Sequence, residues 1–200
     1  MTATIGGASE PQATREAVLD AALAVFTEHT YGGAAMSTLA SRAGVAVGTI
    51  YRHFPSKEAL GNAVYLRWKV QLAEHLFGDA ADSTNAAGSI RAEFSGIWRG
   101  LLRFAAAHPD AFAFLELQQH AGYLDAQSIE VARRIDQAGV AFVVRGQQAG
   151  EIRDGDPDVL VALVYGAFVG LAATVRAGAE LGEQRIQLAE DAVWDMLRAR

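Results

Sequence analysis

The sequence predicts an all-α protein of about nine helices. Almost every apolar segment of the 200-residue chain repeats with the 3.6-residue period of a helix face. Alternating β-branched runs bounded by hairpin turns, the pattern typical of strands, are missing from the sequence. An apolar content of 51% and a charged content of 20% are those of a globular chain that buries a real core, in one large domain or two smaller ones.

The first helix is expected to begin between Ser9 and Thr14, each of which is a plausible cap, and to end near His29. Its buried stripe is expected to consist of Val18, Leu19, Ala22, Leu23, Val25 and Phe26. Tyr-Gly-Gly at residues 31–33 should stop this helix. Residues 1–9 carry neither a basic residue nor an apolar run of signal-peptide length, so we expect a flexible N-terminal arm on a cytoplasmic protein.

The next two helices are short and are separated by a glycine. Residues 37–43 (STLASRA) precede Gly44, which can adopt the left-handed conformation of a helix cap, and Pro55 closes a helix over residues 47–54 (VGTIYRHF). Helices of this length are not stable alone, so both must dock on the first helix. Two helices joined by a tight glycine turn are typical of a helix-turn-helix motif, whose second helix enters the major groove of DNA.

The rest of the chain is expected to be helical as well. Ser56 should cap a fourth helix that ends near residue 77, and the small polar residues 78–89 should form a loop between two parts of the protein. Five further helices are predicted over residues 90–107, 111–121, 128–149, 157–179 and 183–198. The uncharged run at residues 159–175 is barely long enough for a membrane span and lacks anchoring flanks, so we interpret it as a helix buried on all sides.

Charge is distributed unevenly along this acidic chain. The formal net charge is −6, yet residues 42–69 contain five basic residues and one acid. Such asymmetry indicates a local anion-binding surface. Tyr51, Arg52 and His53 should point away from the buried side of the third helix, and Lys57 lies at the N-terminus of the fourth, where free N–H groups and the helix dipole favour phosphate. A solvated helix face is the alternative interpretation.

Residues 14–60 resemble the DNA-binding domain of the TetR family of transcriptional regulators. The resemblance rests on Ala21, Ala22 and Phe26 in the first helix, on LASRAGV in the second, and on GTIYRHFPSKEAL through the third and fourth. It implies a helix-turn-helix DNA-binding domain over residues 10–60 and a helical effector-binding and dimerisation domain over residues 61–200. It further implies a homodimeric repressor that reads a palindromic operator in double-stranded DNA and is released by a small-molecule effector.

The resemblance also implies a role for nine individual residues. Bases would be faced by Val47, Gly48, Thr49 and Arg52, whereas phosphates would be held by Tyr51, His53 and Lys57, with further contacts from Ser37 or Thr38. Hydroxyl, imidazole and ammonium groups suit phosphate, and a guanidinium can read guanine through two hydrogen bonds.

Three residues depart from the family pattern. Ala35 and Ala46 stand where the family commonly has Thr and Ser as caps of the second and third helices, and an Ala cap costs about 1 kcal/mol. Val47 stands where relatives often have Lys, so one charged contact is lost and contact with a thymine methyl group becomes possible.

The C-terminal two thirds suggest an interface and a cavity. Small residues recur every four positions at Ala162, Gly166, Gly170 and Thr174, which lets another helix approach closely. We expect them to form a dimer seam together with Ile186, Val193 and Leu197, with packing inside one subunit as the alternative. An effector cavity could be lined by Trp98, Leu102, Phe112, Leu115, Tyr123, Phe142 and Tyr165, with plain core as the more common role for each of them.

Neither an enzyme nor a cofactor is expected. The sequence contains no cysteine, no metal-ligand spacing and no nucleophile with an adjacent base. Glu116 and His120, four residues apart on one predicted helical face, could bind a polar group or a metal, or could be an exposed local pair. Two alternatives stay open: a DNA-binding regulator controlled by a protein partner, and an enzyme that uses Glu116 and His120 as an acid–base pair.

Overall fold

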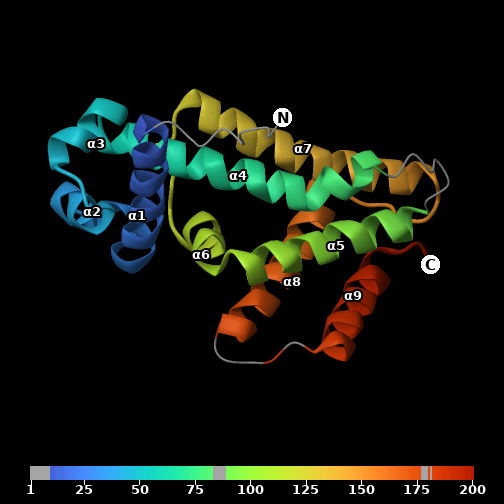
Figure 1. Cartoon of the computed structure of the whole chain (residues 1–200). Coiled ribbons are helices and arrows are strands. Elements are labelled where there is room, and N and C mark those ends of the chain that lie inside the picture. The colour runs from blue at the N-terminus through green and yellow to red at the C-terminus, as the bar shows by residue number, and fades with distance from the viewer. Residues whose placement is uncertain (1–9, 83–88, 177–179, 181) are drawn as a thin grey trace, which may run out of the picture. The chain divides into compact units, whose positions relative to one another are not determined.

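The computed structural model describes residues 10–82, 89–176, 180 and 182–200, and within these residues the chain forms helices and no strand (Figure 1). The helices are α1 (Glu10–Gly33), α2 (Met36–Ala43), α3 (Val47–His53), α4 (Lys57–Asp82), α5 (Ile90–Ala107), α6 (Pro109–Leu117), α7 (Ala126–Gln148), α8 (Pro157–Arg176) and α9 (Glu183–Leu197). The all-α prediction is confirmed. The arm expected at residues 1–9 lies outside the described residues.

Three helix ends differ from the sequence prediction by four residues or more, and several others differ by one or two. The Tyr-Gly-Gly segment does not stop α1, which instead contains a break at Thr30 (φ 59°, ψ 163°) and continues to Gly33. Helix α4 runs on through the first residues of the expected polar loop to Asp82, and residues 83–88 of that loop lie outside the described residues. Helix α6 ends at Leu117, short of the predicted end at residue 121.

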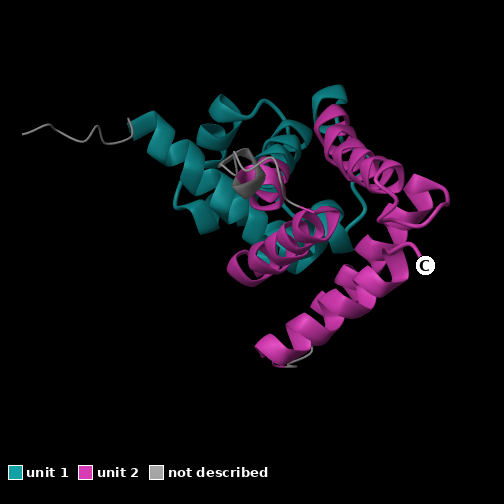
Figure 2. Ribbon diagram, turned by 90° about the vertical axis from the view of Figure 1, so that its right-hand side faces the viewer, with its two compact units in different colours: residues 1–68, 110–128 teal, residues 69–109, 129–200 magenta. Residues whose placement is uncertain are grey.

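The chain divides into two compact units, and each unit consists of two separate segments of the sequence (Figure 2). The first unit contains Met1–Trp68 and Asp110–Ser128, and the second contains Lys69–Pro109 and Ile129–Arg200. Helix α4 therefore passes from the first unit into the second. Nearly all of α6 and the connection that follows it belong to the first unit, together with the helices of the helix-turn-helix motif.

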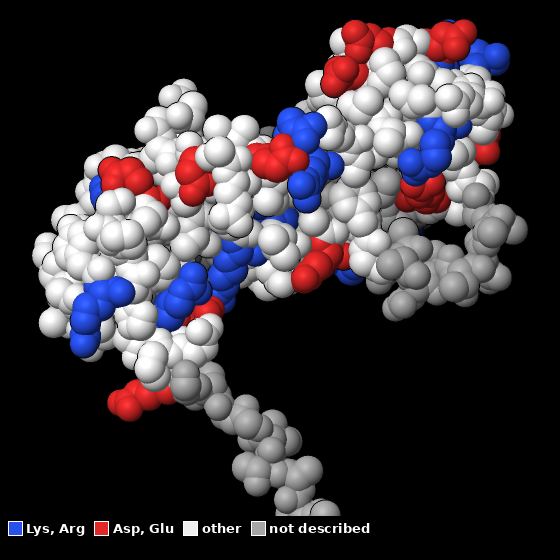
Figure 3. All heavy atoms as spheres, turned by 90° about the horizontal axis from the view of Figure 1, so that it is seen from above, with Lys and Arg blue, Asp and Glu red and all other residues white. Residues whose placement is uncertain are grey.

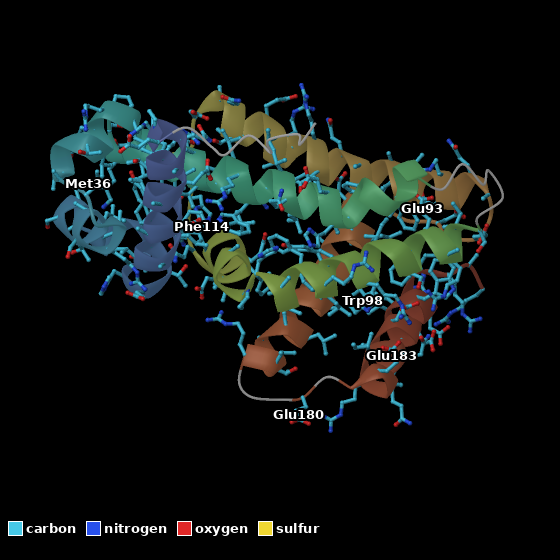
Figure 4. All side chains as sticks on the ribbon, viewed as in Figure 1. Met36, Glu93, Trp98, Phe114, Glu180 and Glu183 are labelled. Carbon is cyan, nitrogen blue, oxygen red and sulfur yellow. The ribbon has the colours of Figure 1, made fainter. Side chains whose placement is uncertain are left out.

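The core of the first unit holds α2 and α3 against α1. Leu39 of α2 and Ile50 of α3 are both fully buried, and Phe54 follows with 3% of its surface exposed. Burial of one such side chain is worth about 1.5–3 kcal/mol, which explains how two helices too short to be stable alone are kept in place. Phe114, on α6 in Figure 4, stacks on Phe26 of α1 with ring centroids 5.9 Å apart.

The second unit is built around α5, which contacts both α8 and α9. The ring of Phe94 lies 5.4 Å from that of Trp194, and the Trp98 ring lies 6.3 Å from Phe168. Gly100 permits a close approach of α5 to α4, because a Cβ atom at this position would lie 2.1 Å from the carbonyl oxygen of His75.

The prediction that residues 159–175 form a helix buried on all sides is wrong within one subunit. Helix α8 turns Leu160, Phe168 and Ala172 inward but leaves Val159 and Leu163 about half exposed. By length and composition alone this helix could cross a membrane, and only 17% of its most apolar stretch is buried. The periodicity showed that α8 is apolar, but could not show how much of it the subunit itself would cover.

Candidate nucleic-acid interface

Helices α2 and α3 are joined by a tight turn that depends on Gly44. This glycine has φ 67° and ψ 30°, the left-handed conformation in which a Cβ atom is disfavoured, and its backbone N–H bonds to the last carbonyls of α2. Ala35 and Ala46 provide no side-chain cap to α2 or α3. Backbone bonds close both first turns instead, from Leu39 N to Ala35 O (3.2 Å) and from Thr49 N to Ala46 O (2.9 Å).

Helix α3 has one buried and one exposed side. Ile50 is fully buried, whereas Val47 and Tyr51 expose 37% and 45% of their surface, and Gly48 and Arg52 are exposed as well. A Cβ atom on Gly48 would meet nothing within 4 Å, so packing within the subunit does not require glycine there. The exposed side of α3 therefore combines apolar and basic side chains with a glycine that has no side chain.

Arg52 is held by its own helix. Its Nη2 atom donates a hydrogen bond of 3.0 Å to Oγ1 of Thr49, which is partly buried one turn earlier. This bond limits the positions open to the guanidinium while leaving its other N–H groups able to bind an acceptor. Thr49 therefore contacts Arg52, a relationship that the sequence prediction did not include.

Lys57 lies in the predicted site but also bonds within the subunit. Its Nζ donates to Ala34 O at 2.6 Å and to Gly32 O at 3.4 Å, and lies 4.8 Å from the centre of the Tyr31 ring. The ammonium group therefore fixes the connection between α1 and α2. An ammonium group has three N–H donors, so one remains for an additional acceptor.

The carboxylate next to Lys57 is kept in its charged form. Hydrogen bonds from its own backbone amide and from the Ser56 hydroxyl lower the pKa of Glu58. Burial, followed by the charge of Glu58, raises the pKa of Tyr31 to about 12, so this ring stays neutral at physiological pH. Ser56 also caps α4 as predicted, with its Oγ accepting from Ala59 N at 3.1 Å.

Helix α2 adds a shallow polar hollow of about 450 Å³. It is lined by the predicted Ser37 and Thr38 and by two residues that sequence reasoning missed, Ser41 and Arg42. The missed residues lie four positions after the predicted ones, and this helical spacing was a signal that could have identified them. His53, the last residue of α3, is half-buried beside Phe54, with ring centroids 6.4 Å apart.

Some of the positive charge in residues 42–69 is neutralised by acids of α1. Arg42 bonds to Glu28 at 2.7 Å, and Arg67 bonds to Asp20 at 2.7 Å. Figure 3 shows one face of the molecule, on which basic and acidic side chains are interspersed. The charge near α3 therefore comes mainly from Arg52 and Lys57, and the sequence count overstated the size of the basic surface.

The residues expected to line an effector cavity fall in both units. Phe112, Leu115, Glu116, His120 and Tyr123 belong to the first unit, and Trp98, Leu102, Phe142 and Tyr165 belong to the second. In the second unit Trp98 exposes only 1% of its surface, and its indole N–H has no hydrogen-bond partner among the described residues. Its ring stacks on Phe94 at 6.1 Å.

Glu116 and His120 do not share a helical face, because α6 ends at Leu117. His120 is buried instead, with Nε2 2.7 Å from Phe114 O and Nδ1 2.6 Å from the Tyr123 hydroxyl. A carbonyl oxygen can only accept, so Nε2 carries the hydrogen and Nδ1 accepts from Tyr123 in a neutral imidazole. Burial raises the pKa of that tyrosine. The predicted acid–base pair is therefore wrong in its geometry.

The expected dimer seam divides into exposed and buried residues. Ala162, Gly166, Gly170 and Thr174 are exposed and Ile186 is half-buried, whereas Val193 (8% exposed) and Leu197 (fully buried) pack inside their own unit. Those last two are corrections to the prediction. Sequence reasoning missed Val159, Leu163 and Val175 on α8 and Leu188 on α9, all of which are exposed. Within the described residues no group of three or more His, Asp or Glu side chains could hold a metal ion.

Two family models match this chain. The model described as "Bacterial regulatory proteins, tetR family" matches residues 18–64, and "Tetracyclin repressor-like, C-terminal domain" matches residues 70–199. The first match covers the helix-turn-helix motif and the second covers nearly all of the remaining chain.

Curated relatives and solved structures agree with these matches. The HTH-type transcriptional regulator UidR of Escherichia coli (strain K12) is 39% identical over 59 residues, 30% of each chain. The HTH-type transcriptional repressor KstR of Mycobacterium tuberculosis is 43% identical over 51 residues, 26% of this chain and 23% of the relative, so these alignments span less than a third of either relative. A TetR family regulator from Marinobacter aquaeolei VT8 has the same fold, with a TM-score of 0.78 and 21% identity over 94% of this chain and 96% of that one.

Proposed function

Because the chain belongs to the TetR family of DNA-binding transcriptional regulators, we propose that it is a homodimeric, cytoplasmic repressor that binds a palindromic operator and is released by a small molecule. The observation that carries the proposal is the division of α3 into a buried side at Ile50 and an exposed side at Val47, Gly48, Tyr51 and Arg52. The buried side of such a helix is packed on the core and a glycine turn precedes it, so its exposed side can enter a major groove.

The exposed side of α3 offers two kinds of contact. Val47, Gly48 and Arg52 face bases in this proposal, since a bare glycine permits close approach and a guanidinium matches the two acceptors of guanine. Tyr51 and His53 at the end of α3, Lys57 on α4, and Ser37 and Thr38 on α2 hold phosphates, which fix the position of the motif without reading sequence. Thr49 contributes through its bond to Arg52.

The exposed apolar side of α8 supports assembly with a second copy of the chain. Val159, Leu163, Gly166 and Gly170 are spaced by four, three and four residues, so they share one helical face, and all four are exposed. A Cβ atom on either glycine would meet nothing within 4 Å, which leaves room for a partner helix. With Leu188 of α9 this face suits a four-helix arrangement across a twofold axis.

Control by a small molecule rests on the second unit. The buried indole N–H of Trp98, unpaired among the described residues, is a donor that a ligand acceptor would satisfy. Its aromatic surroundings, Phe94 and Phe168, favour a largely apolar ligand with at least one acceptor. Control by a protein partner is the competing possibility, and a thermal-shift screen that finds no stabilising small molecule would favour it.

The proposal is tested by selecting bound duplexes from a random DNA pool with the full-length protein. We expect enrichment of an inverted repeat whose two halves are spaced by about one helical turn or a multiple of it. Binding should weaken steeply as salt is raised, because phosphate contacts release counterions. A pool that shows no enriched sequence after repeated rounds would contradict sequence-specific DNA binding.

A further inference from the structure

Helix α1 is broken at Thr30, close to the start of the helix-turn-helix motif. The backbone angles of Thr30 (φ 59°, ψ 163°) lie in a region that residues other than glycine rarely adopt. Such a conformation costs about 1–3 kcal/mol and persists only where the surrounding structure imposes it. Something beyond the local sequence must therefore hold the break in place.

The side chain of Gln118 spans this break. Its Nε2 atom donates a hydrogen bond of 2.7 Å to Phe26 O, in the last turn before the break, and its Oε1 accepts one of 3.3 Å from Tyr31 N, the first amide after it. In an uninterrupted helix the Tyr31 amide would donate to Thr27 O. One amide side chain, 87 residues later in the chain, thus ties together the two parts of α1.

The connection that follows Gln118 is anchored to α4. Buried Asn62 donates to Tyr123 O at 2.8 Å and accepts from Asp125 N at 2.9 Å and from Ser128 Oγ at 2.7 Å. The ring of Tyr123 then stacks on Tyr31 with centroids 3.8 Å apart. The connection after α6 is therefore bonded to α4 within the first unit, and the partly buried Gln118 lies at its start.

We propose that Gln118 is a positioning residue for DNA binding. Its side-chain amide bridges the break at Thr30 and so determines how α2 and α3 are oriented on α1. Only Ala34 and Ala35 separate the end of α1 from α2, so a rotation at Thr30 is passed directly to the helices that carry the predicted DNA contacts. Leu39 and Ile50 keep these helices packed on the core, and Gln118 fixes their angle. This inference rests on the DNA-binding function proposed above.

The test compares Gln118→Met, which keeps the length of the side chain but removes both hydrogen bonds, with the wild type. Gln71→Met is the matched control, because the side chain of Gln71 bonds to Glu74, three residues later, on an exposed surface. Hydrogen exchange of residues 31–34 and affinity for the selected operator are measured on the full-length protein. We expect Gln118→Met to speed exchange at Tyr31 and to weaken operator binding, each about tenfold, which corresponds to about 1.4 kcal/mol. Gln71→Met should change neither.

A double variant separates positioning from stability. Thr30→Gly relieves the strained backbone, so adding it to Gln118→Met should restore the unfolding temperature and keep the variant folded, while operator affinity stays low. The inference is overturned if Gln118→Met binds the operator like the wild type, or if the double variant regains wild-type affinity along with its stability. If the wild type binds no operator at all, the proposed function fails, and the role of Gln118 in DNA binding fails with it. Hydrogen exchange at Tyr31, measured without DNA, still shows in that case whether Gln118 holds the break.

Discussion

Arg52 donates a hydrogen bond of 3.0 Å from Nη2 to Oγ1 of Thr49 on the exposed side of α3. The two residues are one helical turn apart, so the hydroxyl holds a guanidinium that is otherwise free to take several rotamers. If Arg52 reads a base, restricting it before binding lowers the entropy lost on binding. We therefore expect substitutions of Thr49, as well as of Arg52, to change the affinity for the operator.

Thr49→Val should weaken binding to the operator about three- to tenfold, because the valine keeps the shape of threonine but cannot hold Arg52. Thr49→Ser retains the hydroxyl and should bind like the wild type. In the Arg52→Ala background, Thr49→Val should have almost no further effect, since the group that it positions is gone. Titration of all four proteins with the same duplex measures this coupling, and equal losses in both backgrounds would show that Thr49 contacts DNA by itself.

Lys57→Met should have two separable effects. Loss of the bonds to Ala34 O and Gly32 O should lower the free energy of unfolding by about 1 kcal/mol. Loss of a phosphate contact should weaken binding to all sequences about equally and flatten the salt dependence by about one unit. Binding isotherms at several salt concentrations, with Lys69→Met as a control, separate the two. An unchanged salt slope would mean that Lys57 acts only inside the subunit.

Thr30→Gly should stabilise the protein by about 1 kcal/mol, because glycine adopts the observed backbone angles without strain. For a chain of this size that gain raises the unfolding temperature by about 2–4 °C. Thr14→Gly, in a regular part of the same helix, should instead destabilise by about 0.3 kcal/mol. Calorimetry of both variants decides the matter, and a loss of stability in Thr30→Gly would show that Thr30 is not strained.

Leu163→Asp should convert the proposed dimer to a monomer, because it places a charge at the centre of the exposed apolar face of α8. Gly166→Leu should act in the same direction by filling the open space in which we propose that a partner helix packs. Val70→Asp, at an equally exposed apolar position on α4, is the control and should leave the dimer intact. Sedimentation velocity reports the result, and dimers of unchanged stability in both α8 variants would remove this face as the seam.

Glu190 links α9 to α5 and should govern stability in acid. It is 2% exposed, bonds to Arg91 (2.7 Å) and Arg99 (3.0 Å), and lies in the same unit as Glu183, labelled in Figure 4 at the start of α9. Burial acts to raise the pKa of this carboxylate, but hydrogen bonds from Ser95, Arg91 and Arg99 outweigh it, so the pKa is lowered. Glu190→Ala should cost about 1–2 kcal/mol, since Arg91 and Arg99 lose a buried partner but keep Asp191 and Glu183.

Because the pKa of Glu190 is lowered, the stability that this residue contributes depends on pH. A carboxylate whose pKa is lower in the folded state stabilises the protein above its ordinary pKa of 4.5, and this stability is lost as the pH falls through the folded value. Glu190→Gln should therefore flatten the loss of stability below pH 4.5. Asp191→Asn removes a bond to the same Arg91 at a position that is 55% exposed and should change little. Equal acid profiles for wild type and Glu190→Gln would contradict the assignment.

Local patterns in the sequence were sufficient to predict much of this fold. Helix α5 begins and ends where its apolar period and the following His-Pro break predict, and Gly44 caps α2 in the left-handed conformation. The buried residues of α1 carry the predicted stripe from Val18 to Phe26. These features depend on residues within one or two helical turns, so a single sequence contains the information.

Features that depend on distant parts of the chain could not be predicted in this way. The break at Thr30 is bridged by Gln118, and no local signal at Thr30 shows that a glutamine 88 residues later will hold it. Val193 and Leu197 have the spacing of an interface, yet they are covered by their own unit. Periodicity identifies the apolar side of a helix but not the neighbour that covers it, so inward and outward faces could be separated only with the structure.

Substitution of Arg52 tests most directly whether the exposed side of α3 reads DNA. Wild type and Arg52→Ala are used in parallel to select bound duplexes from one random pool. We expect both proteins to enrich the same inverted repeat, but the variant to lose its preference at one position in each half and about 1–3 kcal/mol of affinity for the original operator. If the variant selects the same bases at every position and is only weaker, Arg52 holds the backbone and the claim that it reads sequence is contradicted.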